Sequence, residues 1–245
     1  MFSVSLSERN KPSDFQEKCM SAIAVQNNEI TPAVETRSVI EGVEPTVLAD
    51  IYQAGTNIVV WQRHSIDSLV QAADRILEIH PTLQTSLTVT PQSACAAVGD
   101  ALGTTGAAAV LSEDIAQLVD MFCYLFELKR AGLRLTALDR AMCPRFHVDR
   151  VPCRLVTTYK GVATQWLPHH LVDRSKLGAG SQGMPDEESG LFDQITDIQQ
   201  LNEGNVALLK GELWEGNENT GLVHRSPAIN SEQRRLLLTL DFISG

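Results

Sequence analysis

The sequence predicts an α+β fold in which helices precede a β-rich C-terminal half. In the first half of the chain, apolar residues recur at helical spacing at 66–79 and again at 115–130. After Gly132 the pattern changes to short strand-like segments divided by Gly, Pro, Asn and Asp. These segments are too short and too evenly punctuated for βαβ units. We therefore expect a jelly roll with the helices packed on its main sheet.

The composition is that of a folded, acidic protein. Of the 245 residues, 43% are hydrophobic and 20% are charged, and the formal net charge is -10. This charge argues against partners such as nucleic acid or an anionic membrane. The longest apolar stretches, such as 107–111, are far shorter than the roughly 20 residues of a membrane helix. The N-terminus has no basic and apolar signal sequence, so we expect a cytoplasmic location.

Three parts are expected along the chain. Residues 1–50 are polar, contain three prolines and show no clear period, which predicts a loosely packed arm. Residues 51–132 are expected to form an α/β part, and residues 133–245 the jelly-roll core with a metal site. We expect the second and third parts to be one continuous domain.

The α/β part is predicted to contain two strands and three helices. The strands are 57–62 and 85–90, and the helices are 66–79, capped by Ser65, a segment from Pro91 to Leu102, and 115–130, capped by Ser112. In the core, strands are predicted at 133–138, 152–159, 163–168, 205–213, 220–225 and 234–243. The Gly-, Ser- and acid-rich segment 176–190 is predicted to be a mobile loop of the kind that often becomes a lid.

Charge is segregated within the C-terminal half. Residues 129–176 contain ten basic and three acidic side chains, whereas residues 186–218 contain nine acidic and one basic. This pattern is compatible with two solvated faces that attract each other, or with a basic surround for a small anion.

A candidate metal site lies in this half. His147 and Asp149 are two residues apart, so on a strand both point to the same face and can chelate one cation. His224 would complete a two-histidine, one-carboxylate set, which leaves open positions on iron(II). Arg234 and Arg235 follow it at the start of a strand, where an arginine can pair bidentately with a cosubstrate carboxylate.

The order His147-x-Asp149, His224 and a following arginine resembles the signature of the iron(II)- and 2-oxoglutarate-dependent dioxygenases, whose core is a double-stranded β-helix. The resemblance covers about residues 133–243. It implies that these three residues hold Fe(II) and that the arginine binds 2-oxoglutarate.

The resemblance also implies further cosubstrate residues. Arg235 and Thr239 share a face of the closing strand, as the arginine and its hydroxyl-bearing neighbour often do in this superfamily, which favours Arg235 over Arg234. Tyr159 is the candidate for the tyrosine that often helps to hold 2-oxoglutarate.

The whole chain also resembles a bacterial family known as domain of unknown function eighteen twenty-six. That resemblance suggests zinc homeostasis and a functional link to metal-chaperone GTPases, because relatives tend to be encoded beside them. Three functions therefore stay open. They are an oxygenase of unknown substrate, a non-catalytic protein that binds Zn with the same residues, and an interaction module with an inactive site.

The five cysteines are odd in number and irregularly spaced, which predicts reduced thiols. Cys143, His147 and Cys153 could form an alternative zinc set, but they lack a CxxC knuckle and a fourth ligand. His169 and His170 lie in a predicted loop, where we expect them to face solvent.

Overall fold

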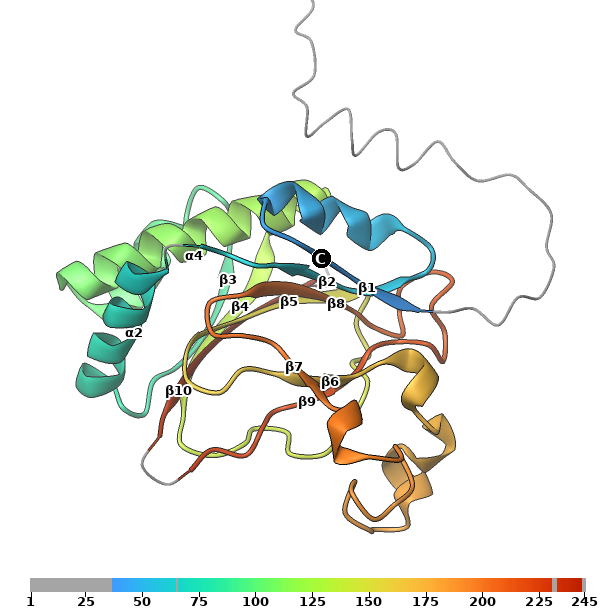
Figure 1. Ribbon diagram of the computed structural model, residues 1–245. Coiled ribbons are helices and arrows are strands. Elements are labelled where there is room, and N and C mark those ends of the chain that lie inside the picture. The colour runs from blue at the N-terminus through green and yellow to red at the C-terminus, as the bar shows by residue number, and fades with distance from the viewer. Residues whose placement is uncertain (1–36, 65, 231–232, 244–245) are drawn as a thin grey trace, which may run out of the picture.

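The computed structural model describes residues 37–64, 66–230 and 233–243, which form two facing sheets and a layer of helices. Figure 1 shows α2 and α4 on one face of the larger sheet and the smaller sheet on the other. In this part of the chain no helix has the length and apolar character needed to cross a membrane. The predicted α+β, jelly-roll fold class is confirmed.

The larger sheet has the strand order β1-β2-β8-β5-β10-β4-β3, and all neighbours are antiparallel except β1 and β2. Its strands are β1 (Ser38–Gly42), β2 (Thr56–Trp61), β3 (Gln84–Val89), β4 (Ala131–Leu138), β5 (Cys153–Lys160), β8 (Val206–Lys210) and β10 (Arg235–Asp241). The smaller sheet has the order β7 (Gln199–Gln200), β6 (Gln165–Leu167) and β9 (Val223–Arg225). The helices are α2 (Asp67–Ile79), α3 (Ala94–Leu102) and α4 (Gly106–Leu125), with short 3-10 helices η1 (Pro45–Tyr52), η2 (His169–Leu171), η3 (Arg174–Lys176), η4 (Gly178–Ser181) and η5 (Ile195–Asp197).

The larger sheet separates two environments. On β10, Leu236, Leu238 and Leu240 belong to the apolar core beneath the helices. Because side chains alternate along a strand, Arg235 and Thr239 point to the opposite side, where they line a cavity. Strands from residues 51–132 and from residues 133–245 lie side by side in this one sheet. Both predicted parts of the chain therefore contribute to the sheet that carries the cavity.

For residues 37–50, the expectation of a loosely packed arm is wrong. They contain β1 and most of η1, in which Val47, Leu48, Ala49 and Ile51 are buried. Neither element is long enough to show a period in the sequence. Residues 1–36 of the predicted arm, and Ser65, lie outside the described residues.

Helix α4 begins earlier than predicted. Thr105 caps it by accepting a hydrogen bond from the Ala108 N–H (3.1 Å). Ser112 is buried inside the helix and donates to the Ala108 carbonyl (2.7 Å) instead of capping it. The alanine-rich run after Gly106 favours helix and moves the start toward the N-terminus.

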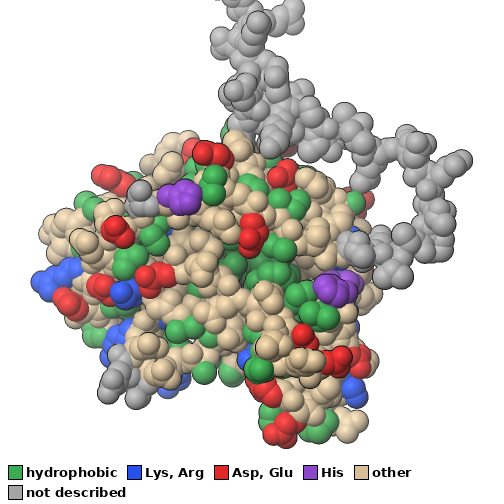
Figure 2. Space-filling model, viewed as in Figure 1, with side chains coloured by type: hydrophobic (Ala, Val, Ile, Leu, Met, Phe, Trp, Pro, Cys, Tyr) green, Lys and Arg blue, Asp and Glu red, His purple; other side chains and the backbone are tan. Residues whose placement is uncertain are grey.

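The segment 176–190, which was predicted to be a mobile loop, is partly packed against the rest of the domain. Leu177 lies against an apolar cluster that includes Leu191 and Phe192. Ser181 and Asp186 are buried within it. The basic and acidic stretches meet here through an ion pair between Arg145 and Asp186, and Figure 2 shows charges of both signs interspersed on the face in view.

A buried ion pair joins α4 to the larger sheet. Arg63 contacts Asp114 at 2.8 Å, with side chains 6% and 15% exposed. The Tyr159 hydroxyl of β5 donates to the same carboxylate at 2.5 Å. Asp114 therefore neutralises one buried cation and holds a buried phenol.

We expect Asp114→Ala to lower the free energy of unfolding by about 3–5 kcal/mol, because Arg63 would remain buried without its counterion. Asp74→Ala is the matched control, since Asp74 pairs with Lys160 at the surface, and it should cost at most about 1 kcal/mol. Urea unfolding measures both. Equal losses would show that the buried pair has no special role.

Candidate functional site

The two predicted histidine ligands are neighbours across an antiparallel bridge. Each backbone N–H, of His147 and of His224, donates to the other residue's carbonyl at 3.0 Å. Their ring centroids are 4.6 Å apart. The backbone thus brings together two side chains that are distant in the sequence.

Asp149 completes the cluster. Its carboxylate oxygens lie 3.7 Å from Nε2 of His147 and 3.3 Å from Nε2 of His224, and one ligand atom from each residue lies within 4.8 Å of the others. Neighbouring ligands on a metal with bonds of about 2.1 Å are about 3 Å apart in an octahedral site. The donor set therefore fits a metal ion that three protein ligands hold on one side.

Backbone carbonyls orient both imidazole rings. Nδ1 of His147 lies 2.9 Å from the Arg145 carbonyl, and Nδ1 of His224 lies 3.2 Å from the Leu222 carbonyl. A carbonyl only accepts hydrogen bonds, so each Nδ1 carries a proton and Nε2 faces the cluster. Burial, and then the neighbouring His224, lower the pKa of His147, which favours the neutral form that binds metals.

Arg154 of β5 holds the carboxylate of Asp149. Its Nη1 donates to Asp149 at 2.6 Å, while Nε and Nη2 donate to Asp241 at 2.7 and 3.1 Å. Burial alone would raise the pKa of Asp149, but its contact with His224 and the positive charge of Arg154 lower the pKa to about 2. Asp149 is therefore ionised at neutral pH. Arg154 lines the site cavity and was not among the candidate residues that the sequence predicted.

Arg235 is fully buried, and its partners are hydroxyl groups. It donates to Thr158 at 3.0 and 3.2 Å, to Thr164 at 2.8 Å and to Ser226 at 3.0 Å. In the described part of the chain, no carboxylate pairs with it. Burial lowers its pKa to about 10, so the guanidinium remains charged at neutral pH. A buried cation of this kind is stabilised by an anion, and none of the described residues supplies one.

One cavity of about 60 Å³ connects these features. Its lining includes His147 and His224 at the cluster and Arg235 and Thr239 on β10. The predicted metal ligands and the predicted arginine therefore face the same space.

Other predicted residues lie elsewhere. Tyr159 points to the helix side of β5 and contacts Asp114, so it cannot reach the cavity, and Thr158 occupies the cavity side instead. Arg234 is exposed and donates to the Pro81 carbonyl at 2.8 Å.

The alternative cysteine site is not assembled. Cys153 is fully buried in the core beneath the helices, whereas Cys143 is exposed and lines the cavity on the other side of the sheet. The four described cysteines are free thiols, and Cys19 lies outside the described residues. His169 lies in η2 and is half-buried, while His170 is exposed, as predicted.

Asp186 links the two segments that carry the histidines. Its side chain is 5% exposed and accepts hydrogen bonds from Arg145 Nε at 2.8 Å and from the Phe146 N–H at 2.7 Å. Nη1 of Arg225 lies 3.5 Å from the same carboxylate. Arg225 also stacks on Phe146, 4.3 Å from the ring centroid. Asp186 is thus a positioning residue, which the sequence could not distinguish from the other acids of its segment.

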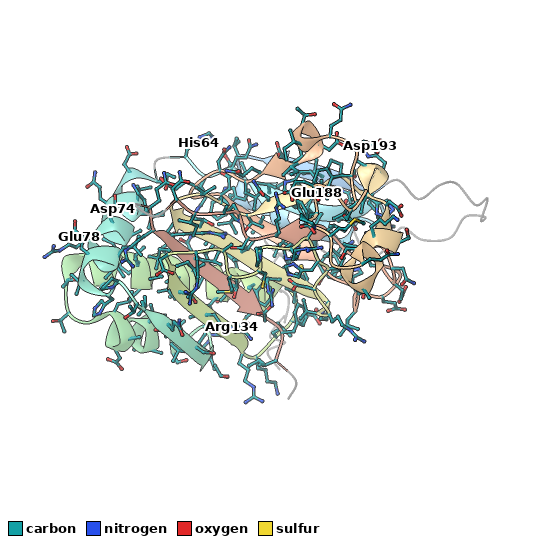
Figure 3. The ribbon with its side chains drawn as sticks, turned by 90° about the horizontal axis from the view of Figure 1, so that it is seen from below. His64, Asp74, Glu78, Arg134, Glu188 and Asp193 are labelled. Atoms are coloured by element: carbon teal, nitrogen blue, oxygen red, sulfur yellow. The ribbon has the colours of Figure 1, made fainter. Side chains whose placement is uncertain are left out.

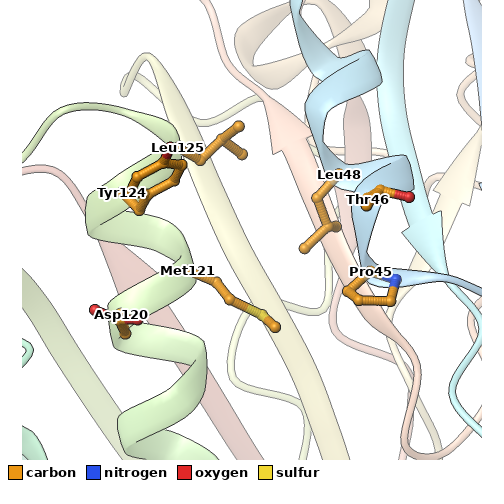
Figure 4. A pocket seen from close by; sticks show the side chains of 7 residues that line it. All are labelled: Pro45, Thr46, Leu48, Asp120, Met121, Tyr124 and Leu125. Atoms are coloured by element: carbon orange, nitrogen blue, oxygen red, sulfur yellow. The ribbon is translucent and has the colours of Figure 1, made fainter. Parts of the chain in front are cut away.

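A second hollow lies far from this chemistry. In Figure 4, Met121 of α4 points toward Pro45 and Leu48 of η1 across an apolar pocket of about 250 Å³. It lies in the helix layer, where none of its lining residues is a histidine or a cysteine.

These features define the class of protein: a jelly-roll protein with a potential metal site between its two sheets. The chain belongs to the family described as "Protein of unknown function (DUF1826)", whose profile matches residues 42–241. No curated protein sequence matches the chain significantly.

Several solved structures are similar to this chain at low identity. The dioxygenase for auxin oxidation 1 from Arabidopsis thaliana is 8% identical, with a TM-score of 0.45 over 85% of this chain and 93% of that one. The rice dioxygenase for auxin oxidation is 11% identical, with a TM-score of 0.47 over 85% and 83%. A prolyl-4-hydroxylase from Pseudomonas putida is 13% identical, with a TM-score of 0.41 over 81% and 97%.

We expect His147→Ala, Asp149→Ala and His224→Ala each to abolish stoichiometric iron(II) binding, because two remaining ligands are too few for a stable site. His170→Ala is the control and should bind normally. Anaerobic calorimetry measures the stoichiometry. The same loss in the His170 variant would mean that the three ligands are misassigned.

We expect Asp186→Asn to weaken metal binding about tenfold, because the amide cannot accept all the hydrogen bonds that fix the histidine segments. Glu188→Gln is the matched control, since Glu188 is exposed in the same segment. Metal titration with a fluorescent competitor measures both. Unchanged affinity in the Asp186 variant would show that the bridge alone positions the ligands.

Proposed function

We propose that this protein is an iron(II)- and 2-oxoglutarate-dependent oxygenase acting on an organic substrate. One observation carries the proposal: among the described residues the buried guanidinium of Arg235 has hydroxyl groups as its partners, and it faces the same cavity as the histidine and aspartate cluster. A cation and a metal site in one cavity suit a dicarboxylate that contacts both.

In this proposal His147, Asp149 and His224 hold the metal. The distal carboxylate of 2-oxoglutarate replaces some of the hydroxyl oxygens as acceptor for the planar fork of Arg235, and the released hydroxyls donate to the same carboxylate. When bound, iron and 2-oxoglutarate supply the activation of O₂ that oxidises a C–H bond.

The chain's own residues prepare this site. Arg154 keeps one oxygen of Asp149 fixed, and burial keeps His147 in its neutral form. The side chains of Val156, Leu209 and Leu237 line the cavity and limit the water that can enter. A drier site strengthens the attraction between Arg235 and an anion.

The second candidate is a non-catalytic metal-binding protein that serves zinc homeostasis. Two imidazoles and a carboxylate also suit Zn, and this is the observation that favours it. A link to a metal-chaperone GTPase, and a cytoplasmic location, remain predictions. In this second function Arg235 has no ligand to bind. The effect of substituting Arg235 on 2-oxoglutarate binding therefore distinguishes the two candidate functions.

We expect Arg235→Leu to weaken 2-oxoglutarate binding by about 2–4 kcal/mol, because the carboxylate loses its buried counterion. Iron(II) affinity should stay within about threefold, since Arg235 is not one of the proposed metal ligands. Arg235→Lys should recover part of the loss, because a point charge cannot form the two-pronged contact. The measurement is the visible charge-transfer band when 2-oxoglutarate is added anaerobically to the iron form.

Arg234→Leu is the control and should change neither affinity, because Arg234 faces solvent. Circular dichroism verifies that the variants fold. If neither Arg235→Leu nor Arg234→Leu alters the titration, the proposal that 2-oxoglutarate is the cosubstrate is wrong. A flat spectrum together with tight zinc binding would favour the second candidate.

A further inference from the structure

An open cleft lies beside the candidate site, on strands β3 and β4. It has a volume of about 500 Å³, and its lining includes Gln84, Ser86, Arg134, Asp139, Arg140 and Met142. Gln84, Ser86 and Arg134 are exposed. Figure 3, which views the molecule from below, shows Arg134 near the β10 ribbon.

The cleft and the site cavity share one face of the sheet. In the antiparallel pairing of β4 with β10, Arg134 lies opposite Thr239 and Leu138 lies opposite Arg235. Residues opposite each other point to the same face, with Cα atoms about 4.5–5.5 Å apart. Thr239 and Arg235 line the site cavity, and Met142 lines both spaces. A molecule in the cleft would therefore lie next to the metal cavity.

The charges in the cleft favour an anion. Arg134 and Arg140 are both exposed, and neither forms an ion pair with another described residue. Asp139 is the one acidic side chain in the lining. Two guanidinium groups suit a carboxylate or a phosphate, and the volume is that of a site for a small organic molecule.

We propose that this cleft binds a small organic anion, a carboxylic acid or a phosphate ester, through Arg134 and Arg140. The claim that this anion is the substrate of the metal site rests on the proposed oxygenase function. The claim that the cleft binds an anion does not rest on that function, because neither arginine belongs to the metal cluster or to the Arg235 pocket. The rest of the molecule would extend past Met142 toward His147 and His224.

The first experiment titrates the metal-free protein, without 2-oxoglutarate, and follows the fluorine NMR signal of each probe. The probes are para-fluorobenzoate and para-fluorophenyl phosphate, with neutral para-fluorobenzamide for comparison. We expect at least one anion to bind and the amide to bind about tenfold more weakly or not at all. A preference between the two anions identifies the acidic group.

Matched variants locate the probe. Arg134→Gln and Arg140→Gln should each weaken anion binding about tenfold, whereas Arg130→Gln should not, because Arg130 is exposed outside the lining. If neither anion binds, or if both cleft variants bind as well as the unsubstituted protein, the proposal is overturned.

The second experiment tests the position next to the metal site. Manganese(II), whose binding is verified by electron paramagnetic resonance, should broaden the signal of the bound probe. In His224→Ala the probe should still bind but should no longer be broadened. A probe that binds without broadening beside bound manganese would place the anion elsewhere. If manganese does not bind, the metal proposal fails, and the titration alone decides the anion site.

Discussion

The pair of backbone hydrogen bonds between His147 and His224 is the constraint on which the site depends. It sets the spacing of the two imidazole rings. It also places Asp149 close to them, because Asp149 follows His147 by two residues. The bridge lies outside the regular ladders, so further contacts must support it. Asp186 supplies them by bonding to both flanking segments. A segment that resembles a free surface loop in sequence is thus part of the framework of the metal cluster.

The larger sheet adds a second constraint, because a shift of one residue in any strand exchanges its two faces. On β5, Thr158 contacts Arg235 while Tyr159 contacts Asp114 on the helix side. The pairing of β5 with β10 is irregular between Leu236 and Leu237, next to these residues. The same alternation therefore provides both the apolar core under the helices and the polar wall of the cavity.

Much of this arrangement could be predicted from the sequence. The strands and helix α2 have clear periods, and the ligand triad has a spacing that resembles a known family. Alternation along the last strand predicted that one of Arg234 and Arg235 faces inward, and the resemblance to the dioxygenases favoured Arg235. The roles of Arg154 and Asp186 could not be predicted, because each depends on a tertiary contact and has no local pattern. Tyr159 was a candidate because a tyrosine often helps to hold 2-oxoglutarate in the superfamily that the sequence resembles. Its side chain lies on the helix side of β5, so it cannot contact a ligand in the cavity.

The hydroxyl groups around Arg235 have a consequence for the stability of the protein when no anion is bound. A folded chain that keeps a desolvated cation without a counterion is less stable than the same chain with an anion in place. Any anion that binds only the folded state raises its stability by RT ln(1 + [L]/Kd). Because the described partners of Arg235 are the hydroxyls of Thr158, Thr164 and Ser226, the free energy of unfolding should depend on which anions the solution contains.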